Sequence, residues 1–593
     1  MKRVSAFKTH RLPDTAFTAL AAGGGEPAVI RLLCETQQSK HTMLLHAIAE
    51  AVGDADLVDP GIAAFRAGYD LLTRIQAADP GACAWLLSLP HLGGWAHDGL
   101  IRLEQGMPPD FAYLACAAAS GAVRAGVPFD LDVPVRDGCV LLPGLGRLDA
   151  GGGTAWIRLR YDGEQLAAGD GAAARRLILG PDYGSDQPVP GWRGTPALRA
   201  QANGLAWDVL LVTDDPYLDR YTLPMSAGLS AGELRRWRQR VQSAWEILVR
   251  HHRWAAEAIA AGVSVIVPLT PQSETDLISA TSPAAFGAIA TSWPPDPVTL
   301  AETLVHEFQH VKLCGLLDMV PLTESGGEKV YAPWRQDPRP AAGLLQGVYA
   351  HLGIVRFWQA QRQAETDPDD ILRAHVQFAR WRPTIGTAVN TLLRTGSLAP
   401  AGARFAGLLR DQGSLLADEP VPGLAEQIAR EVALDHQLTW QIRHLATDQA
   451  AVARLAEAYR HGEPFPAQHR TAVWVQEDIR KLSSSVRSRL LNMSYLEPAR
   501  YRELCADRVV PLSKPDRLLL DRAAEAAAAG YRDLITGSAD PQPDAWVGLA
   551  LALHQLPSSP LRHAFTVHLP ALFDVHSCLG IGCDPLDLGG WFG

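Results

Sequence analysis

The sequence predicts a predominantly helical α+β protein, and three observations indicate this class. Apolar residues recur at helical spacing before residue 125 and again through most of the chain after residue 297. Between about residues 126 and 228 the pattern changes to short alternating or β-branched runs bounded by glycine and proline. Two more short apolar runs directly precede a long helical segment. We therefore predict four regions: a helical N-terminal region (1–125), a small β-rich module (126–228), a core (229–400) and a helical C-terminal region (401–593).

The composition narrows the class of protein further. The chain has 593 residues, of which 47% are hydrophobic and 20% charged, and its net charge is −10, which argues against general nucleic-acid binding. No run reaches 18 apolar residues, and the start MKRVSAFKTHRLPDTAF lacks the apolar core of a signal peptide. The eight cysteines include no CxxC pair. We expect a cytoplasmic protein with reduced thiols that binds neither nucleic acid nor membrane.

The first two regions carry few chemical signals. Gly23-Gly24-Gly25 marks a break, and helical spacing then predicts helices over 28–33, 43–52, 62–77 and 111–125. In the β-rich module, Arg136-Asp137-Gly138 is typical of a tight hairpin turn. We expect a small antiparallel sheet. Its role is either a scaffold or an exposed edge that pairs with an extended peptide.

The core begins with one long amphipathic helix over 230–262, which Gly262 closes. Two strands follow, 263–269 and 285–293. They directly precede the helix predicted from residue 297 to 319, and a strand in this position is suited to binding an extended peptide. It does not distinguish one peptide chemistry from another.

The segment from Pro297 to Met319 predicts a helix that carries a metal-binding motif. Asp296 can cap its first turn, and Pro297 fits the first helical position. The motif is His306-Glu307-Phe308-Gln309-His310; residues four apart share a helical face, so both imidazoles can point at one metal ion. The alternative is a core helix whose two histidines are merely packed.

The third ligand is harder to predict. A metzincin continues HExxHxxGxxH, but Leu316 stands where its third histidine would be, so that class is excluded. Glu324 lies in a glycine-rich loop, and Asp318 is about 12 Å further along a straight helix than His310. The preferred ligand is His351, in a second predicted buried helix over 343–358. Glu324 and Asp318 are held in reserve, because a gluzincin-type site takes a carboxylate as its third ligand.

Between these two helices, Arg335 and Arg339 stand in a proline-rich segment, APWRQDPRP (332–340). Proline restricts both its own backbone and that of the residue before it, so the arginines are presented on a stiff segment. Arginine is suited to holding a carboxylate with two parallel N–H groups. We predict a carboxylate clamp for a substrate or cosubstrate. The alternative is a structural pair between an arginine and Asp337.

After residue 358 the sequence predicts further helices over 369–416 and 425–462. The tail from about 467 is expected to be helical too. AAEAAAAGYRDLITGSADPQPDAWVGLALAL near the C-terminus is typical of a helix pair, with no repeat period.

The stretches 300–322, 332–340 and 343–358 resemble the HExxH proteins of modified-peptide biosynthesis, now grouped as 2-oxoglutarate-dependent peptide β-hydroxylases. Weaker similarity extends to THRLPDTAFTALAAGGG and to AWVGLALAL, so the resemblance covers most of the chain. It implies Fe(II), 2-oxoglutarate and dioxygen as reactants and a ribosomally made precursor peptide as substrate. It also implies that Arg335 or Arg339 binds the distal carboxylate of 2-oxoglutarate, and that Glu307 orients a ligand or a bound water.

Two other functions stay open at this point. A zinc metallopeptidase would use Glu307 as a general base and needs a glutamate ligand. A non-catalytic peptide-binding scaffold would carry no metal.

Overall fold

The computed structural model describes most of the chain, and it divides into two compact units, Met1–Pro321 and Leu322–Gly593. This division lies inside the range 229–400 that we predicted as one core. The seven described cysteines are free thiols, and Cys505 lies outside the described residues. The described residues are 9–53, 59–151, 154–170, 174–178, 189–218, 224–226, 228–270, 277–466, 473–476, 486–497, 501–504, 512–538 and 542–593.

The predicted fold class is confirmed, because helices dominate and the sheets are small. In the described part of the chain, no helix is long and apolar enough to cross a membrane.

The first unit begins with helices whose N-termini are marked by aspartate or proline. Asp59 and Asp79 each accept hydrogen bonds from two backbone N–H groups of the helix they precede, and proline opens four of these helices. The segments predicted over 28–33 and 43–52 form one continuous helix. The helices are α1 (Asp14–Ala21), α2 (Pro27–Val52), α3 (Pro60–Ala78), α4 (Pro80–Ser88), α5 (Pro90–Glu104) and α6 (Tyr113–Ala125).

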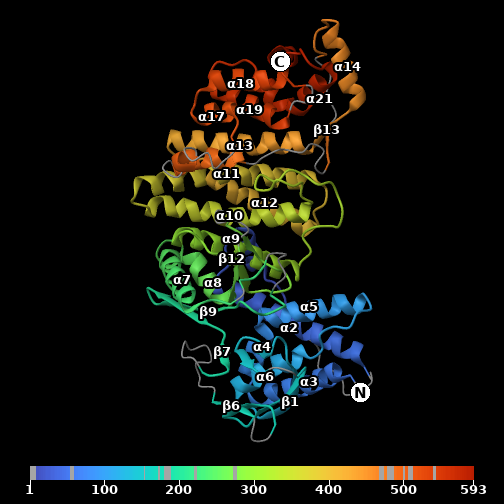
Figure 1. Cartoon of the computed structure of the whole chain (residues 1–593), viewed down its shortest axis with the longest axis vertical. Helices are drawn as coiled ribbons and strands as arrows, with labels where there is room; N and C mark the ends of the chain where they lie inside the picture. The colour runs from blue at the N-terminus through green and yellow to red at the C-terminus, as the bar shows by residue number, and fades with distance from the viewer. Residues whose placement is uncertain are drawn as a thin grey trace. The chain divides into compact units, whose positions relative to one another are not determined.

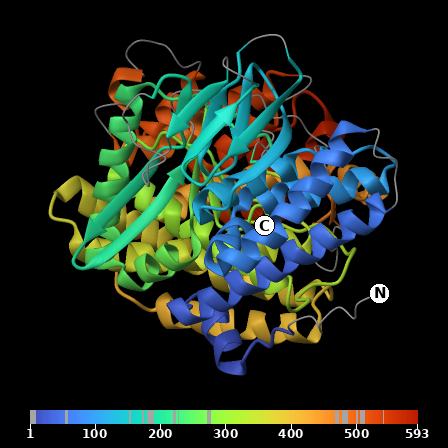
Figure 2. The same ribbon diagram turned by 90° about the horizontal axis from the view of Figure 1, so that it is seen from below.

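Two antiparallel sheets follow, which confirms the expected β-rich module. The hairpin turn lies where predicted: Arg136 and Cys139 exchange backbone hydrogen bonds, and Asp137 and Gly138 both have positive φ. One sheet has the order β1 (Phe129–Pro134), β4 (Trp156–Tyr161), β5 (Gln165–Ala168) and β6 (Arg175–Ile178); the other has β2 (Cys139–Leu142), β3 (Gly146–Asp149) and β7 (Trp192–Gly194). Helices α3 and α6 pack on β1, so these cyan strands and blue helices lie together (Figure 2).

A third sheet joins the end of that module to the strands before the motif helix. Its order is β11 (Ser279–Ala280), β12 (Ala288–Ser292), β10 (Val265–Leu269), β9 (Leu205–Leu211) and β8 (Ala197–Ala202). Strand β10 runs parallel to both neighbours, and the outer pairs are antiparallel. Every residue of β10 and β12 is buried, as expected of strands covered on both faces.

Helices α7 (Ala231–His251), α8 (Arg253–Gly262) and α9 (Pro297–Leu317) lie against this sheet (Figure 1). The single helix predicted over 230–262 is wrong, because the chain leaves helical geometry at the fully buried His252 (φ −133°, ψ 42°). The carbonyl oxygen of His252 accepts hydrogen bonds from the first turn of α8. The break lets α7 pack on β8 and α9 while α8 packs on α2 and β9.

The second unit is almost entirely helical. Helix α11 packs against α10, α12 and α13, and α13 packs against α19, which gives successive helical layers within this unit (Figure 1). The predicted C-terminal helix pair is α18 with α19. The elements are α10 (Ala341–Ala364), α11 (Pro368–Arg394), α12 (Pro400–Ala417), α13 (Gly423–His444), β13 (Leu445–Thr447), α14 (Gln449–Arg460), β14 (Val473–Val475), α15 (Val486–Leu496), α17 (Lys514–Leu520), α18 (Ala524–Thr536), α19 (Pro543–Gln555), α20 (Arg562–Val567), α21 (Leu569–Leu579) and α22 (Pro585–Phe592).

Candidate metal centre

Helix α9 begins as the sequence predicts. The carboxylate of Asp296 accepts a hydrogen bond from the backbone N–H of Thr299 at 2.7 Å, and Pro297 occupies the first helical position. The helix is buried on nearly every side, and it continues through Gly315. A Cβ there would lie 2.9 Å from the ring of Phe286, so glycine permits this close packing.

A buried lysine fixes α9 to the N-terminal segment. Lys312 is only 1% exposed, and its ammonium group donates hydrogen bonds to the carbonyl oxygens of Gly23 and Gly24 at 2.9 and 2.7 Å. The predicted break at Gly23-Gly24-Gly25 therefore has a structural role. Its carbonyl oxygens accept the hydrogen bonds of the buried Lys312 ammonium group, two residues beyond the motif.

His306 and His310 lie close together on one face of α9. Their ring centroids are 5.0 Å apart, and the ring planes meet at 81°. Burial lowers the pKa of His306 to about 4, with the neighbouring Glu307 acting against that shift. His306 is therefore neutral near pH 7, which is the state in which imidazole binds a metal ion.

Glu307 is held by two hydroxyl groups from the edge of the third sheet. The residue is 2% exposed. Ser279 donates a hydrogen bond to Oε1 at 2.6 Å, and Thr281 donates one to Oε2 at 2.7 Å. Ser279 belongs to strand β11, which pairs with β12, so the sheet fixes this carboxylate. Oε1 lies 3.9 Å from Nε2 of His306.

The sequence did not identify Ser279 and Thr281. Their signal is weak, since β11 is only two residues long and has no alternating apolar pattern. The only sign in the sequence was a group of three hydroxyl side chains, SATS (279–282), just before the second predicted strand.

The two carboxylates held in reserve have other surroundings. Asp318 follows α9, and its Oδ2 accepts hydrogen bonds from Gln37 and Lys40 of α2, each at 2.8 Å. The Asp318 carboxylate therefore binds side chains of α2. Glu324, in the second unit, has an exposed side chain, and its backbone N–H donates to the carbonyl oxygen of Ser397.

His351 lies in the second unit, on α10, and is 5% exposed. Its ring stacks on Trp334, with centroids 4.4 Å apart, and meets the edge of Trp381 at 4.7 Å. Nδ1 lies 2.8 Å from the carbonyl oxygen of Gly347. A Cβ at Gly347 would fall 2.2 Å from the Trp334 indole nitrogen, so glycine is required there. If Nδ1 carries the proton and donates it to Gly347, Nε2 keeps a lone pair, the form that metal-binding histidines usually take.

Arg335 and Arg339 share one carboxylate. Nε of Arg335 donates to Oδ1 of Asp337, and Nη1 of Arg339 donates to Oδ2, both at 2.9 Å. Burial acts to raise the pKa of Asp337, but the hydrogen bonds from the two arginines outweigh it and the pKa is lowered. The pairing that we gave as the structural alternative is therefore present, and it involves both arginines.

Helix α13 fastens this arginine-bearing loop through two histidines that the sequence did not identify. Nε2 of His444 lies 2.6 Å from the carbonyl oxygen of Gln336, and Nδ1 of His436 lies 2.9 Å from the hydroxyl of Tyr331. Both contacts join residues more than 100 positions apart. The loop is thus held in one conformation by the helix beside it.

Two imidazoles on one helical face fit a divalent ion such as iron or zinc, both of which accept imidazole nitrogen. Within either unit, the described residues contain no group of three or more histidine, cysteine, aspartate or glutamate side chains arranged around one point. That His306 and His310 bind a metal ion stays a prediction, and so does the identity of a third ligand.

A comparison of this chain with models of known protein families gives no match. The chemistry of the site is therefore inferred from its own residues.

Proposed function

We propose that the protein is an Fe(II)- and 2-oxoglutarate-dependent dioxygenase that hydroxylates a Cβ in a ribosomally made precursor peptide. The observation that carries this proposal is the arrangement of the motif. His306 and His310 lie together on one face of α9, while both oxygens of Glu307 accept hydroxyl hydrogen bonds.

The arrangement of Glu307 favours this function over zinc peptidase chemistry. A general base must reach the proton it removes, directly or through one water. Both carboxylate oxygens of Glu307 instead accept hydrogen bonds from Ser279 and Thr281, and the residue is 2% exposed. Glu307 is therefore a positioning residue in this proposal, and it holds the motif helix against the sheet.

The histidines would hold the metal. When bound, iron with 2-oxoglutarate and dioxygen supplies the oxidation: one oxygen atom converts a peptide C–H to C–OH, and the other enters succinate as carbon dioxide is lost. His306 stays neutral at the working pH because burial lowers its pKa to about 4. No proton has to leave that ring before metal binds.

The peptide would bind as an extended strand at β11. This strand is at the end of the five-stranded sheet in the described part of the chain, so one of its edges is available for pairing. Ser279 of β11 also contacts Glu307. A peptide paired there would lie beside the motif.

Arg335 and Arg339 would bind the distal carboxylate of 2-oxoglutarate. Asp337 uses only Nε of Arg335 and Nη1 of Arg339. In this proposal Asp337 orients the two guanidinium planes, and the remaining N–H groups meet the cosubstrate.

The test is a reaction with the cognate precursor peptide under anaerobic loading of Fe(II), followed by 2-oxoglutarate and air. We expect the intact mass of the peptide to rise by one oxygen atom, with one succinate formed for each hydroxyl. His306→Ala should abolish both products. His46→Ala, an exposed histidine on α2, should react like the wild type.

A second reaction with Zn(II) and without 2-oxoglutarate separates the peptidase. Peptide fragments formed under those conditions would overturn the proposal in favour of hydrolysis. An unchanged peptide in both reactions, with no metal retained, would leave only the scaffold function.

A further inference from the structure

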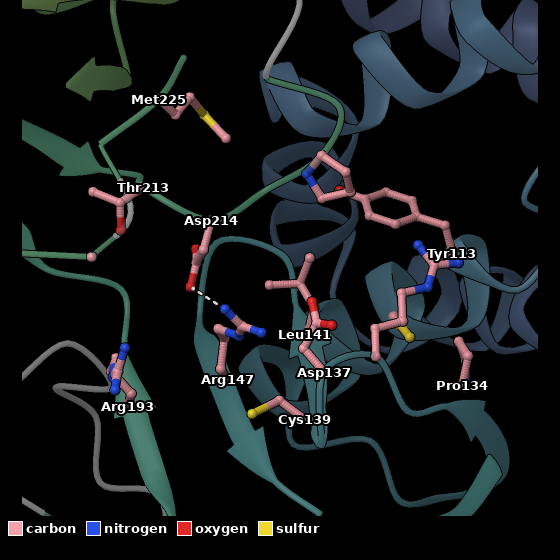
Figure 3. A pocket seen from close by; sticks show the side chains of 14 residues that line it. Tyr113, Pro134, Asp137, Cys139, Leu141, Arg147, Arg193, Thr213, Asp214 and Met225 are labelled. Atoms are coloured by element: carbon pink, nitrogen blue, oxygen red, sulfur yellow. Dashed lines mark ion pairs between the residues drawn. The ribbon is translucent and has the colours of Figure 1, made fainter. Parts of the chain in front are cut away.

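Two adjoining cavities lie in the first unit, outside the candidate metal centre. Their volumes are about 480 and 520 Å³, within the range of small-molecule sites, and they share Asp137, Cys139, Arg147 and Arg193. The cavity of about 480 Å³ is bounded by the three-stranded sheet, by α6 and by the segment after β9 (Figure 3). Nothing in the proposed hydroxylation uses these residues.

Arg147 and Arg193 are direct cross-strand neighbours. They are register partners on the antiparallel strands β3 and β7, so their side chains leave the same face of the sheet. Like charges placed directly opposite one another destabilise a sheet. Both side chains line both cavities, so an anion bound there would relieve this repulsion.

The carboxylates of the cavity neutralise this arginine pair incompletely. Asp214 lies 3.6 Å from Arg147, which is too long for a direct hydrogen bond, and Nε of Arg147 is buried without a hydrogen-bond partner among the described residues. Burial raises the pKa of Asp214, with Arg147 acting against that shift. In the part of the chain that the structure describes, no carboxylate lies within ion-pair distance of Arg193.

A third arginine in the wall is already satisfied. Arg136 is bound by the carboxylate of Asp110, and the hydroxyl of Tyr217 donates to the same carboxylate at 2.8 Å. The cationic character available to a ligand therefore belongs to Arg147 and Arg193.

Apolar side chains also line the cavity of about 480 Å³. Leu141 lies beside Arg147, and Met225 lies across the space from it (Figure 3). Pro216 lines the same cavity. A ligand that fills this space therefore needs a charged end and an apolar body.

We propose that this cavity binds a small organic carboxylate, with its carboxylate between Arg147 and Arg193 and its apolar body against Leu141 and Met225. A guanidinium pair matches the planar carboxylate. A carboxylate is favoured over a phosphate ester because Asp137 and Asp214 already place two negative charges in the wall. A monoanion adds the least repulsion. This site is independent of the iron chemistry proposed above.

The test is calorimetric titration of the full chain with 3-phenylpropanoate, its uncharged amide and phenyl phosphate. We expect the wild type to bind the carboxylate and to bind the amide and the phosphate ester more weakly. Arg193→Gln and Arg147→Gln should each weaken carboxylate binding about ten- to a hundredfold, the effect of losing a charge-assisted hydrogen bond. Arg199→Gln is the matched control, since Arg199 is 70% exposed on β8 and lines neither cavity.

Alkylation of Cys139 gives a second readout that does not depend on heat of binding. Cys139 is half-buried, is a free thiol and lines both cavities. Saturating 3-phenylpropanoate should slow its reaction with iodoacetamide in the wild type but not in Arg193→Gln. The exposed Cys578, in the second unit, should react at one rate throughout.

Three results would overturn the proposal. They are equal binding of the acid and its amide, tighter binding of phenyl phosphate than of the acid, and unchanged affinity in both Arg147→Gln and Arg193→Gln. Because each variant is also assayed for peptide hydroxylation, failure of this site is distinguishable from failure of the proposed function.

Discussion

The hydroxyl of Thr281 lies 2.7 Å from Oε2 of Glu307 and donates a hydrogen bond to it, and it also lies 3.2 Å from the backbone oxygen of the same residue. A segment at the edge of the sheet is thus joined to both the side chain and the main chain of the motif. Ser279 completes the arrangement at Oε1. The position of α9 at its histidines therefore depends on two hydroxyl groups that lie outside it.

The first prediction concerns this hydrogen bond. Thr281→Val keeps the side-chain shape but leaves one oxygen of a buried carboxylate without its donor. We expect the free energy of unfolding to fall by about 1.5–3 kcal/mol, the range for hydrogen bonds to charged groups. Urea unfolding measures it. Thr42→Val is the control, because its hydroxyl makes only an exposed bond to Gln38 on α2, and it should change stability by less than about 0.5 kcal/mol. Equal effects of the two substitutions would contradict the role given to Thr281.

The second prediction concerns the metal. His306→Ala or His310→Ala should remove bound iron, because the two ligands that remain rarely hold Fe(II) against dialysis. Iron content by elemental analysis checks it, with the exposed His46→Ala as control. Iron retained in both single variants would mean that the motif is structural.

The third prediction tests His351 as a ligand. His351→Phe keeps an aromatic ring between Trp334 and Trp381 but removes both ring nitrogens. If His351 binds the metal, iron affinity should fall at least tenfold while the thermal midpoint changes little. A variant that melts lower and binds iron normally would instead assign His351 to the core of the second unit.

Much of α9 could be predicted from sequence because its signals are local. Asp296, Pro297 and the spacing of His306 and His310 act within one or two helical turns, so the cap, the start and the shared face were all predicted correctly. The partners of Glu307 could not be predicted in this way. Ser279 belongs to a two-residue strand and Thr281 directly follows it, and the position of this strand depends on pairing with β12, about ten residues further along the chain.

The same reasoning applies to the sheet and to α7 and α8. Strand β9 pairs in parallel with β10 although more than 50 residues separate them, and no local pattern encodes such a register. The break at His252 is similar. Helical spacing continues through this residue, and the change of direction follows from packing of α8 on α2 and β9.

The fourth prediction concerns the arginine loop. Arg335→Lys or Arg339→Lys should raise KM for 2-oxoglutarate about ten- to a hundredfold, since lysine keeps the charge but loses the two parallel N–H donors. KM for the peptide should change little. Asp337→Asn is the informative comparison. If the arginines serve only to stiffen the loop, this variant will reproduce the arginine variants, with a lower thermal midpoint and equal defects toward both substrates.

The last prediction is a pH dependence that His436 contributes. Burial, together with the nearby Arg380, lowers the pKa of His436 from 6.5 to about 4. Above about pH 6.5 the ring is neutral whether the chain is folded or unfolded, so it does not make the free energy of unfolding depend on pH. Between pH 6.5 and 4 the unfolded chain binds a proton that the folded chain does not, and stability falls as the pH falls. The contribution is on the order of 2 kcal/mol, since one pKa unit corresponds to about 1.4 kcal/mol and the ring is partly screened by solvent.

His436→Gln should be less stable than the wild type at pH 7.5, because it changes the contact with Tyr331, and this difference in stability should narrow by pH 4.5. Urea midpoints at several pH values measure this difference, with the exposed His461→Gln as control. Parallel pH profiles for His436→Gln and the wild type would show that this imidazole titrates normally in the folded protein.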